Sequence, residues 1–292
     1  MQAITRKIEL RLDQLQTKDY NKVHKPFYKQ IESYYDGDAE DFDNRYWKNA
    51  VLQRIRQDFR EEVKRYEFSK ILEIGYGTGI DLVHFGTTHP DVKVVGIDIS
   101  EGMQKTAIKR IQNKELKNVT ALKGKVEDMD ELFSGEQFDM IYVFFGALNT
   151  VEDLDETARI LYRFTSGNGI LALSFVNKYY IGGVLTEMLK LRFRAAFSRL
   201  RPEWGGYSPT RYLPSRCYSS RQIKKAFNGF RLIKIKGYSI IHPAWYHHGL
   251  NRILKRFHPI LWRADQVLNK TVFCRFGEYA LYIFKKPDNV SQ

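Results

Sequence analysis

The chain has 292 residues and carries 47 Lys and Arg against 34 Asp and Glu, a formal net charge of +13. Its 43% hydrophobic and 28% charged residues are ordinary values for a folded protein and exclude disorder of the whole chain. Two cysteines, Cys217 and Cys274, exclude a disulfide framework and do not cluster with histidines at zinc-ligand spacing, so we expect no metal site.

The N-terminal region, residues 1–68, is expected to form a helical cap. Its first 20 residues lack the apolar core of a signal peptide. No apolar run in the chain approaches the roughly 18 residues that a membrane span requires. We therefore expect a cytoplasmic protein with reduced thiols, in which the cap precedes the main domain, residues 69–292.

From Ser69 to Val176 the sequence alternates short apolar runs with helical stretches. Buried strands are predicted at 70–75, 92–98, 119–124, 138–145 and 169–176, with helices starting near Gly79, around 103–111 and at 153–164. Continuous apolar strands separated by helices are typical of a parallel sheet that is covered on both faces. The fold class is therefore α/β, a Rossmann-like, doubly wound sheet.

All of the net positive charge lies in one third of the chain. Residues 178–275 hold 20 Lys and Arg and three acids, a net +17, whereas the remainder holds 27 basic and 31 acidic residues, a net −4. Such asymmetry indicates an anionic partner. In this stretch, residues 184–200 are predicted to form one amphipathic helix, and further strands are predicted at 231–241 and 276–286.

The first strand ends in a glycine-rich turn, Glu73-Ile74-Gly75-Tyr76-Gly77-Thr78-Gly79. Glycines permit a tight turn and a close approach of the backbone to a ligand, before a helix N-terminus. The dinucleotide pattern G-x-G-x-x-G would need glycine where this chain has Ile80, so a nicotinamide enzyme is the weaker interpretation. Glu73 suits a ligand with a cationic amino group, and Asp98, after the second strand, suits ribose hydroxyls. Together they describe S-adenosylmethionine.

These motifs resemble the class I S-adenosylmethionine-dependent methyltransferases of the small-molecule, quinone and natural-product type. Residues 72–79 match the family's glycine motif, residues 96–103 its ribose segment and residues 138–153 its fourth-strand motif. The resemblance implies S-adenosylmethionine as cofactor, a seven-stranded sheet with an antiparallel last strand, and a basic substrate lid inserted after strand five at 178–216.

The resemblance also implies a set of cofactor contacts. Lys125 stands where the family usually has Asp in its third segment, so Val126 and Glu127 are expected to make that contact instead. The implied cofactor-binding residues are Glu73, Gly75, Gly77, Gly79, Asp98, Ile99, Met103, Val126, Glu127, Phe144, Phe145, Tyr35 and Tyr46.

Methyl transfer requires alignment of the reactants and often a general base for the acceptor's proton. No motif identifies that base. The candidates are His242, His247 and His248, in the segment after the predicted sixth strand, and the alternative is that they are ordinary histidines of a surface loop.

The basic insert leaves three interpretations open. It is a lid helix that packs its apolar face on the domain, a membrane-surface helix that meets anionic lipid, or an RNA-binding surface of interleaved aromatics and cations. We rank a lipophilic or anionic small-molecule acceptor, with peripheral membrane contact, above nucleic acid, because the apolar residues share one helical face. A methyltransferase-like binding module without catalysis is the alternative from another class. No sequence feature specifies the acceptor atom or an oligomeric state.

Overall fold

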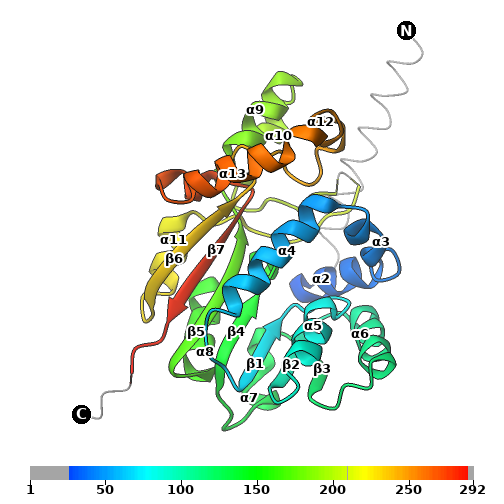
Figure 1. The fold of residues 1–292 in the computed structure, drawn as a ribbon, viewed down its shortest axis with the longest axis vertical. Helices are drawn as coiled ribbons and strands as arrows, with labels where there is room; N and C mark the ends of the chain where they lie inside the picture. The colour runs from blue at the N-terminus through cyan, green and yellow to red at the C-terminus, as the bar shows by residue number, and fades with distance from the viewer. Residues whose placement is uncertain (1–25, 209, 289–292) are drawn as a thin grey trace.

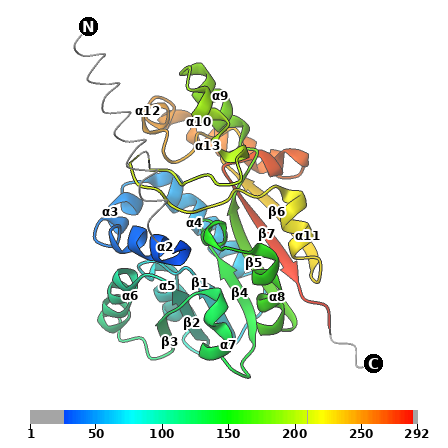
Figure 2. The same cartoon turned by 180° about the vertical axis from the view of Figure 1, so that it is seen from behind.

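The computed structural model describes residues 26–208 and 210–288, which build one seven-stranded sheet between two layers of helices (Figures 1 and 2). The strand order is β3-β2-β1-β4-β5-β7-β6. Strands β1 to β5 pair in parallel, whereas β7 is antiparallel to both of its neighbours. The Rossmann-like fold with seven strands and an antiparallel last strand is therefore confirmed. The strands are β1 (Lys70–Ile74), β2 (Lys93–Asp98), β3 (Val119–Lys123), β4 (Phe138–Val143), β5 (Thr165–Val176), β6 (Arg231–Tyr238) and β7 (Tyr279–Lys285).

Two apolar layers hold the helices against the sheet. On one face lie α7 (Met129–Leu132), α8 (Leu154–Phe164) and α11 (Ser220–Ala226). On the other lie α4 (Ala50–Val63), α5 (Ile80–Thr88), α6 (Glu101–Asn113) and α13 (His258–Leu268). Short 3-10 turns, η1 (Val126–Asp128) and η2 (Ala147–Thr150), follow β3 and β4. The chain reverses its direction across the sheet between β1 and β4, which is where open α/β sheets bind ligands.

The described part of the predicted cap consists of α2 (Phe27–Asp36), α3 (Phe42–Trp47) and α4, and the portion before Pro26 lies outside the described residues. Two carboxylates tie the cap to the sheet. Asp36 accepts hydrogen bonds from the Ser100 hydroxyl (2.6 Å) and the Gly102 amide (3.0 Å). Asp43 accepts from the Thr78 hydroxyl (2.6 Å). The cap is thereby held over the ends of β1 and β2.

The single helix predicted at 184–200 is wrong. The chain forms α9 (Ile181–Leu189), α10 (Phe193–Ala196) and η3 (Ser198–Leu200) instead, which we call the lid segment. The break falls at Leu191, whose φ of 58° is left-handed, and whose amide donates to the Met188 carbonyl at 2.8 Å. This geometry ends a helix in the manner of a left-handed C-cap.

The apolar face of the lid segment does not pack on the domain, contrary to the first of the three interpretations. Helix α9 buries none of its residues, and Leu185 and Leu189 are 57% and 86% exposed. Between β6 and β7 the chain forms α12 (His248–Ile253), η4 (Lys255–Phe257), α13 and η5 (Val272–Phe276). Helices α12 and α13 gather with α9 and α10 at one end of the molecule in both views (Figures 1 and 2). Within the described ranges, no helix is both long and apolar enough to cross a bilayer.

Candidate functional site

A cavity of about 2230 Å³ opens at the carboxyl ends of the parallel strands, beside the point where the strand order reverses. Its walls come from the glycine turn, the ends of β2 and β4, the cap helices, the lid segment and the segment before α12. Small-molecule pockets usually measure roughly 300–1000 Å³. The cavity therefore has room for a cofactor and a second molecule together.

The glycine turn brings backbone to the edge of this cavity. Gly75, Gly77 and Gly79 have φ values of 72°, 56° and 76°, a left-handed conformation that glycine adopts without strain. Gly75 and Gly77 line the cavity, but Gly79 does not. A Cβ on Gly79 would lie 2.8 Å from the Cβ of Ala107, so this glycine allows α5 to pack closely on α6.

Asp98 is held at the end of β2 and faces the turn. Its carboxylate accepts hydrogen bonds from the amides of Gly77 (2.8 Å) and Ser100 (2.9 Å), and only 7% of the residue is exposed. Burial raises the pKa of Asp98 to about 6, because the charged form is poorly solvated there. A carboxylate fixed in this way can accept further hydrogen bonds from the hydroxyls of a ribose.

One acidic and one basic side chain lie beside the turn. Glu73, 2% exposed, accepts a hydrogen bond from the Tyr142 hydroxyl (2.9 Å), and burial together with the nearby Asp81 raises the pKa of Glu73. Arg56, on α4, forms an ion pair with Asp81, and its Nε has no hydrogen-bond partner among the described residues. Glu73 and Arg56 both line the cavity, where they could hold the ammonium and the carboxylate of an amino-acid group.

Arg56 is not among the site residues predicted from the sequence. Its guanidinium stacks over the rings of Tyr46 and Phe145, with its central carbon 4.4 Å and 4.8 Å from their centroids. The available signal was a cation next to Ile55, on the helix that precedes the first strand and buries Val51, Ile55 and Phe59. Such a position is too common in amphipathic helices to single out one arginine.

The third-strand segment supplies an apolar slot with a polar end. Ile99, Met103 and Val126 line the cavity beside it. Glu127 accepts a hydrogen bond from the Tyr28 hydroxyl through one oxygen, while its Oε2 is buried and has no partner in the described part of the chain. Lys125 forms an ion pair with Asp128. An adenine ring fits this chemistry, since its amino group can donate to the unpartnered oxygen of Glu127.

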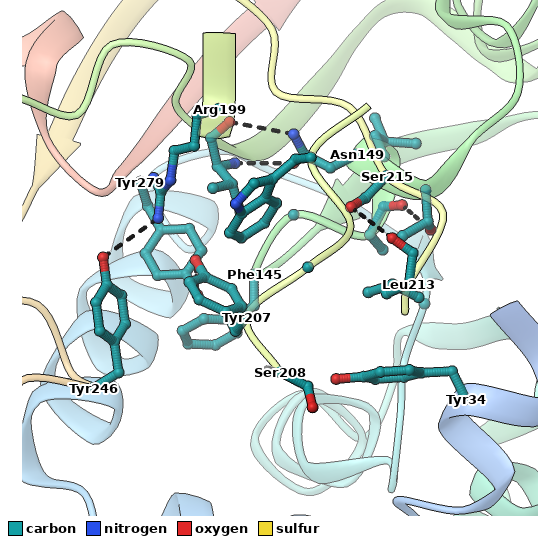
Figure 3. Close-up of a pocket in the computed structure, with 18 of the residues that line it drawn as sticks. Tyr34, Phe145, Asn149, Arg199, Tyr207, Ser208, Leu213, Ser215, Tyr246 and Tyr279 are labelled. Atoms are coloured by element: carbon teal, nitrogen blue, oxygen red, sulfur yellow. Dashed lines mark hydrogen bonds between the residues drawn. The ribbon is translucent and has the colours of Figure 1, made fainter. Parts of the chain in front are cut away.

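An aromatic chamber continues the cavity beyond the turn (Figure 3). Phe145, with a left-handed φ of 55° after β4, meets Tyr279 edge-on at a centroid distance of 5.7 Å. Tyr207 packs against Trp204 at 4.5 Å and against Trp245 at 5.3 Å. Phe144, Tyr34, Tyr35 and Tyr46 also line the cavity. The predicted contacts Phe144, Phe145, Tyr35 and Tyr46 thus lie at one cavity.

A buried carboxylate fixes the chamber wall. Glu278 is fully buried and accepts hydrogen bonds from Arg199 (2.8 and 2.9 Å), Tyr246 (3.1 Å) and Tyr207. Burial and the charge of Glu278 hold the pKa of Tyr207 well above its ordinary value, so the phenol keeps its proton. Glu278 itself does not line the cavity, and its charge is balanced by Arg199. The network orients the aromatic walls and leaves them uncharged.

The three candidate histidines are separated by the fold. His247 is buried and lines the cavity, and burial lowers its pKa, so its imidazole is neutral at pH 7. His242 and His248 do not line the cavity, which corrects the expectation for both. The Asp265 carboxylate accepts the amides of Ile240, Ile241 and His242, and His242 lies in a smaller hollow with His258 and Trp262. His248 begins α12 and is exposed.

The comparisons with known proteins agree with this geometry. A family model described as a methyltransferase domain matches residues 67–203. An uncharacterized protein, RP028, of Rickettsia prowazekii is 32% identical over 111 residues, which cover 37% of this chain and only 43% of that protein's length. A demethylmenaquinone methyltransferase of Listeria welshimeri is 28% identical over 202 residues, covering 65% of this chain and 75% of that enzyme.

A solved structure has the same fold. It is a Thermotoga maritima protein described as an S-adenosylmethionine-dependent methyltransferase, possible histamine N-methyltransferase. It is 17% identical and superposes with a TM-score of 0.53, covering 88% of this chain and 99% of that one. At this identity the likeness concerns the architecture alone.

Proposed function

We propose that this chain is a class I S-adenosylmethionine-dependent methyltransferase and that it methylates a small lipophilic acceptor that carries a planar ring; its fold and the match to a methyltransferase domain support the proposal. The observation that carries the proposal is the single cavity that joins the polar turn around Asp98 to the aromatic chamber. Planar rings bind well between aromatic faces and edges. The relatives named as demethylmenaquinone methyltransferases support a quinol-like acceptor.

The residues divide the work of binding between two ends of the cavity. When bound, S-adenosylmethionine supplies a methyl group activated by its sulfonium charge. Asp98 would hold the ribose and Glu127 the adenine amino group, while Glu73 and Arg56 would hold the charged amino-acid end. The chamber around Phe145 would exclude water and favour the cationic methyl group through its aromatic rings.

His247 is the candidate for the proton that the acceptor loses. A neutral imidazole can accept a proton near pH 7, and the Nε2 of His247 is buried without a hydrogen-bond partner among the described residues. We further propose that the inserted residues 178–216 act as the substrate lid and that the protein works as a cytoplasmic enzyme in peripheral contact with an anionic membrane.

The test is calorimetric titration of the full chain with S-adenosylmethionine, followed by transfer of labelled methyl groups. The acceptor panel contains lipophilic quinols of increasing chain length, their oxidised forms and unfractionated tRNA. We expect cofactor binding and labelling of a quinol. Failure to bind S-adenosylmethionine would refute the proposal that the chain is a methyltransferase. Labelling of tRNA alone would refute the proposal that the acceptor is a small lipophilic molecule.

A further inference from the structure

The exposed apolar side chains of this protein are concentrated at one end of the molecule. Of the twenty large apolar side chains that are exposed in the described part of the chain, eight lie in the lid segment and its connections and seven in the segment from α12 to η5. The most exposed include Leu189 (86%), Leu191 (77%) and Ile253 (75%). We call the exposed surface of these two segments the apolar end. Contiguous apolar exposure of this kind marks an interaction surface.

The two segments are remote in sequence but adjacent in space. Both views place α9 and α10 beside α12 and α13 (Figures 1 and 2). Lys190, after α9, lies close enough to His247, before α12, to contribute to lowering the pKa of that histidine. The apolar end is therefore one surface, and the sequence pattern of residues 184–200 revealed only half of it.

The charges of the apolar end that pair with no described carboxylate are all positive. Arg194, Arg252, Lys255, Arg256, Arg263 and Lys270 belong to it, and none forms an ion pair with a described carboxylate. Its two acids are already engaged: Glu187 pairs with Lys190 and Arg192, and the buried Asp265 accepts backbone amides. A second copy of this chain would bring these cations against one another. An anionic surface would neutralise them.

An anionic bilayer fits both properties at once. Amphipathic helices with basic and bulky apolar residues bind at the membrane interface, where apolar side chains enter the acyl boundary and cations meet lipid phosphates. RNA would neutralise the cations but would leave Leu189, Leu191 and Ile253 exposed to water. The chemistry of this surface therefore favours lipid over nucleic acid.

The lid segment also forms a wall of the cavity. Leu185, Leu191 and Phe193 are exposed at the apolar end and line the cavity as well. We propose that the apolar end docks on an anionic lipid bilayer and that the acceptor passes from the bilayer into the cavity along the lid segment. The docking is independent of methyl transfer, whereas the passage of an acceptor rests on the proposed function.

The docking test measures binding of the full chain to vesicles without cofactor. Vesicles of phosphatidylcholine alone are compared with vesicles that contain about one third phosphatidylglycerol, at low and high salt. We expect binding to the anionic vesicles only, weakened by salt because the lipid charge is screened. Equal and negligible binding to both vesicle types would overturn the proposal.

Two variants locate the surface. Leu189→Glu combined with Ile253→Glu is expected to weaken vesicle binding at least tenfold. The matched control is Ile233→Glu on β6, which is 42% exposed and lies outside the apolar end, and it should bind as the unaltered chain does. If the double variant bound vesicles as tightly as the unaltered chain, the apolar end would not be the docking surface. The proposal would also be overturned if sedimentation showed that the unaltered chain is a dimer and the double variant a monomer.

The double variant should bind S-adenosylmethionine with the affinity of the unaltered chain, and this result would show that the variant is folded. If vesicles bind but no lipophilic acceptor is methylated, the docking stands and the proposed acceptor fails. If a soluble acceptor is methylated without vesicle binding, the docking fails and the methyltransferase stands.

Discussion

Asp98 offers the sharpest test of the cofactor site, through the substitution Asp98→Ala. The carboxylate is fixed by the amides of Gly77 and Ser100 and faces the cavity. Two ribose hydroxyls donating to a charged acceptor contribute about 1.5–3 kcal/mol each, or about 3–6 kcal/mol together. At about 1.4 kcal/mol per factor of ten, Asp98→Ala should raise the Kd for S-adenosylmethionine by roughly 10²- to 10⁴-fold. The assay is isothermal titration.

The control for Asp98→Ala is Asp139→Ala. Asp139 lies at the amino end of the central strand β4, away from the cavity, where its carboxylate accepts hydrogen bonds from the amides of Ser69 (2.9 Å) and Lys70 (3.1 Å). Both substitutions remove a carboxylate that accepts hydrogen bonds from two backbone amides, so the two variants lose the same kind of contact. Only Asp98→Ala should weaken cofactor binding. A Kd within threefold of the unaltered chain would refute our placement of the ribose.

The pH dependence gives the same residue a second readout. Because the pKa of Asp98 rises from 3.8 to about 6 in the fold, the folded chain retains this proton more strongly than the unfolded chain. The contribution of Asp98 to stability is thus complete below pH 3.8 and is lost as the pH rises through about 6. The pH dependence of cofactor affinity has the opposite sign, because the ribose hydroxyls donate to the ionised Asp98 carboxylate. Affinity should fall about tenfold from pH 7 to pH 5, and Asp98→Ala should remove this dependence.

Three further predictions concern the walls of the same cavity. Gly75→Ala places a Cβ 2.5 Å from the Cβ of Ala147 at a φ of +72°, whereas the new Cβ of Gly77→Ala meets only Phe42, at 3.7 Å. Gly75→Ala should therefore lower the free energy of unfolding more than Gly77→Ala, which urea unfolding of the two variants would measure. Arg56→Met should raise the cofactor Kd about tenfold in titration, whereas Arg60→Met, which removes the other partner of Asp81 outside the cavity, should leave it within threefold. Glu127→Ala should also raise that Kd about tenfold, against no change for Glu131→Ala on α7, and equal effects of the two would contradict the adenine placement.

The fold and the cofactor turn were predictable because their signals are local. Apolar runs of strand length alternate with helical periods from β1 to β5, and the glycines of the turn adopt left-handed conformations that are compatible with few other residues. The break of the 184–200 helix was missed because Leu191, a strong helix former, adopts a left-handed conformation that no local residue type signals.

The aromatic chamber could not be predicted for a different reason. Phe145, Tyr207, Trp245 and Tyr279 come from the end of β4, the loop after the lid segment, the segment before α12 and the start of β7. They meet only because β7 inserts between β5 and β6 and brings Glu278 and Tyr279 beside the cavity. Long-range contacts of this kind leave no periodic trace in one sequence. The same holds for Glu278, whose fully buried charge depends on Arg199, 79 positions earlier in the chain.

Two groups of cations in the basic stretch have different consequences. One group is tied to the acids of the fold: Lys234 and Lys236 pair with Glu62 on α4, Arg211 pairs with Asp38 in the cap, and Arg199 pairs with Glu278. These cations join the C-terminal third of the chain to the slightly acidic remainder. The other group, at the apolar end, pairs with no described carboxylate and stands among exposed leucines and isoleucines. Substituting Lys234 should therefore alter stability, whereas substituting Arg194 or Lys255 should alter only what the protein binds. The net charge of the stretch thus includes cations that form ion pairs within the fold and cations at the surface that form none. Only the surface cations are available to bind a partner.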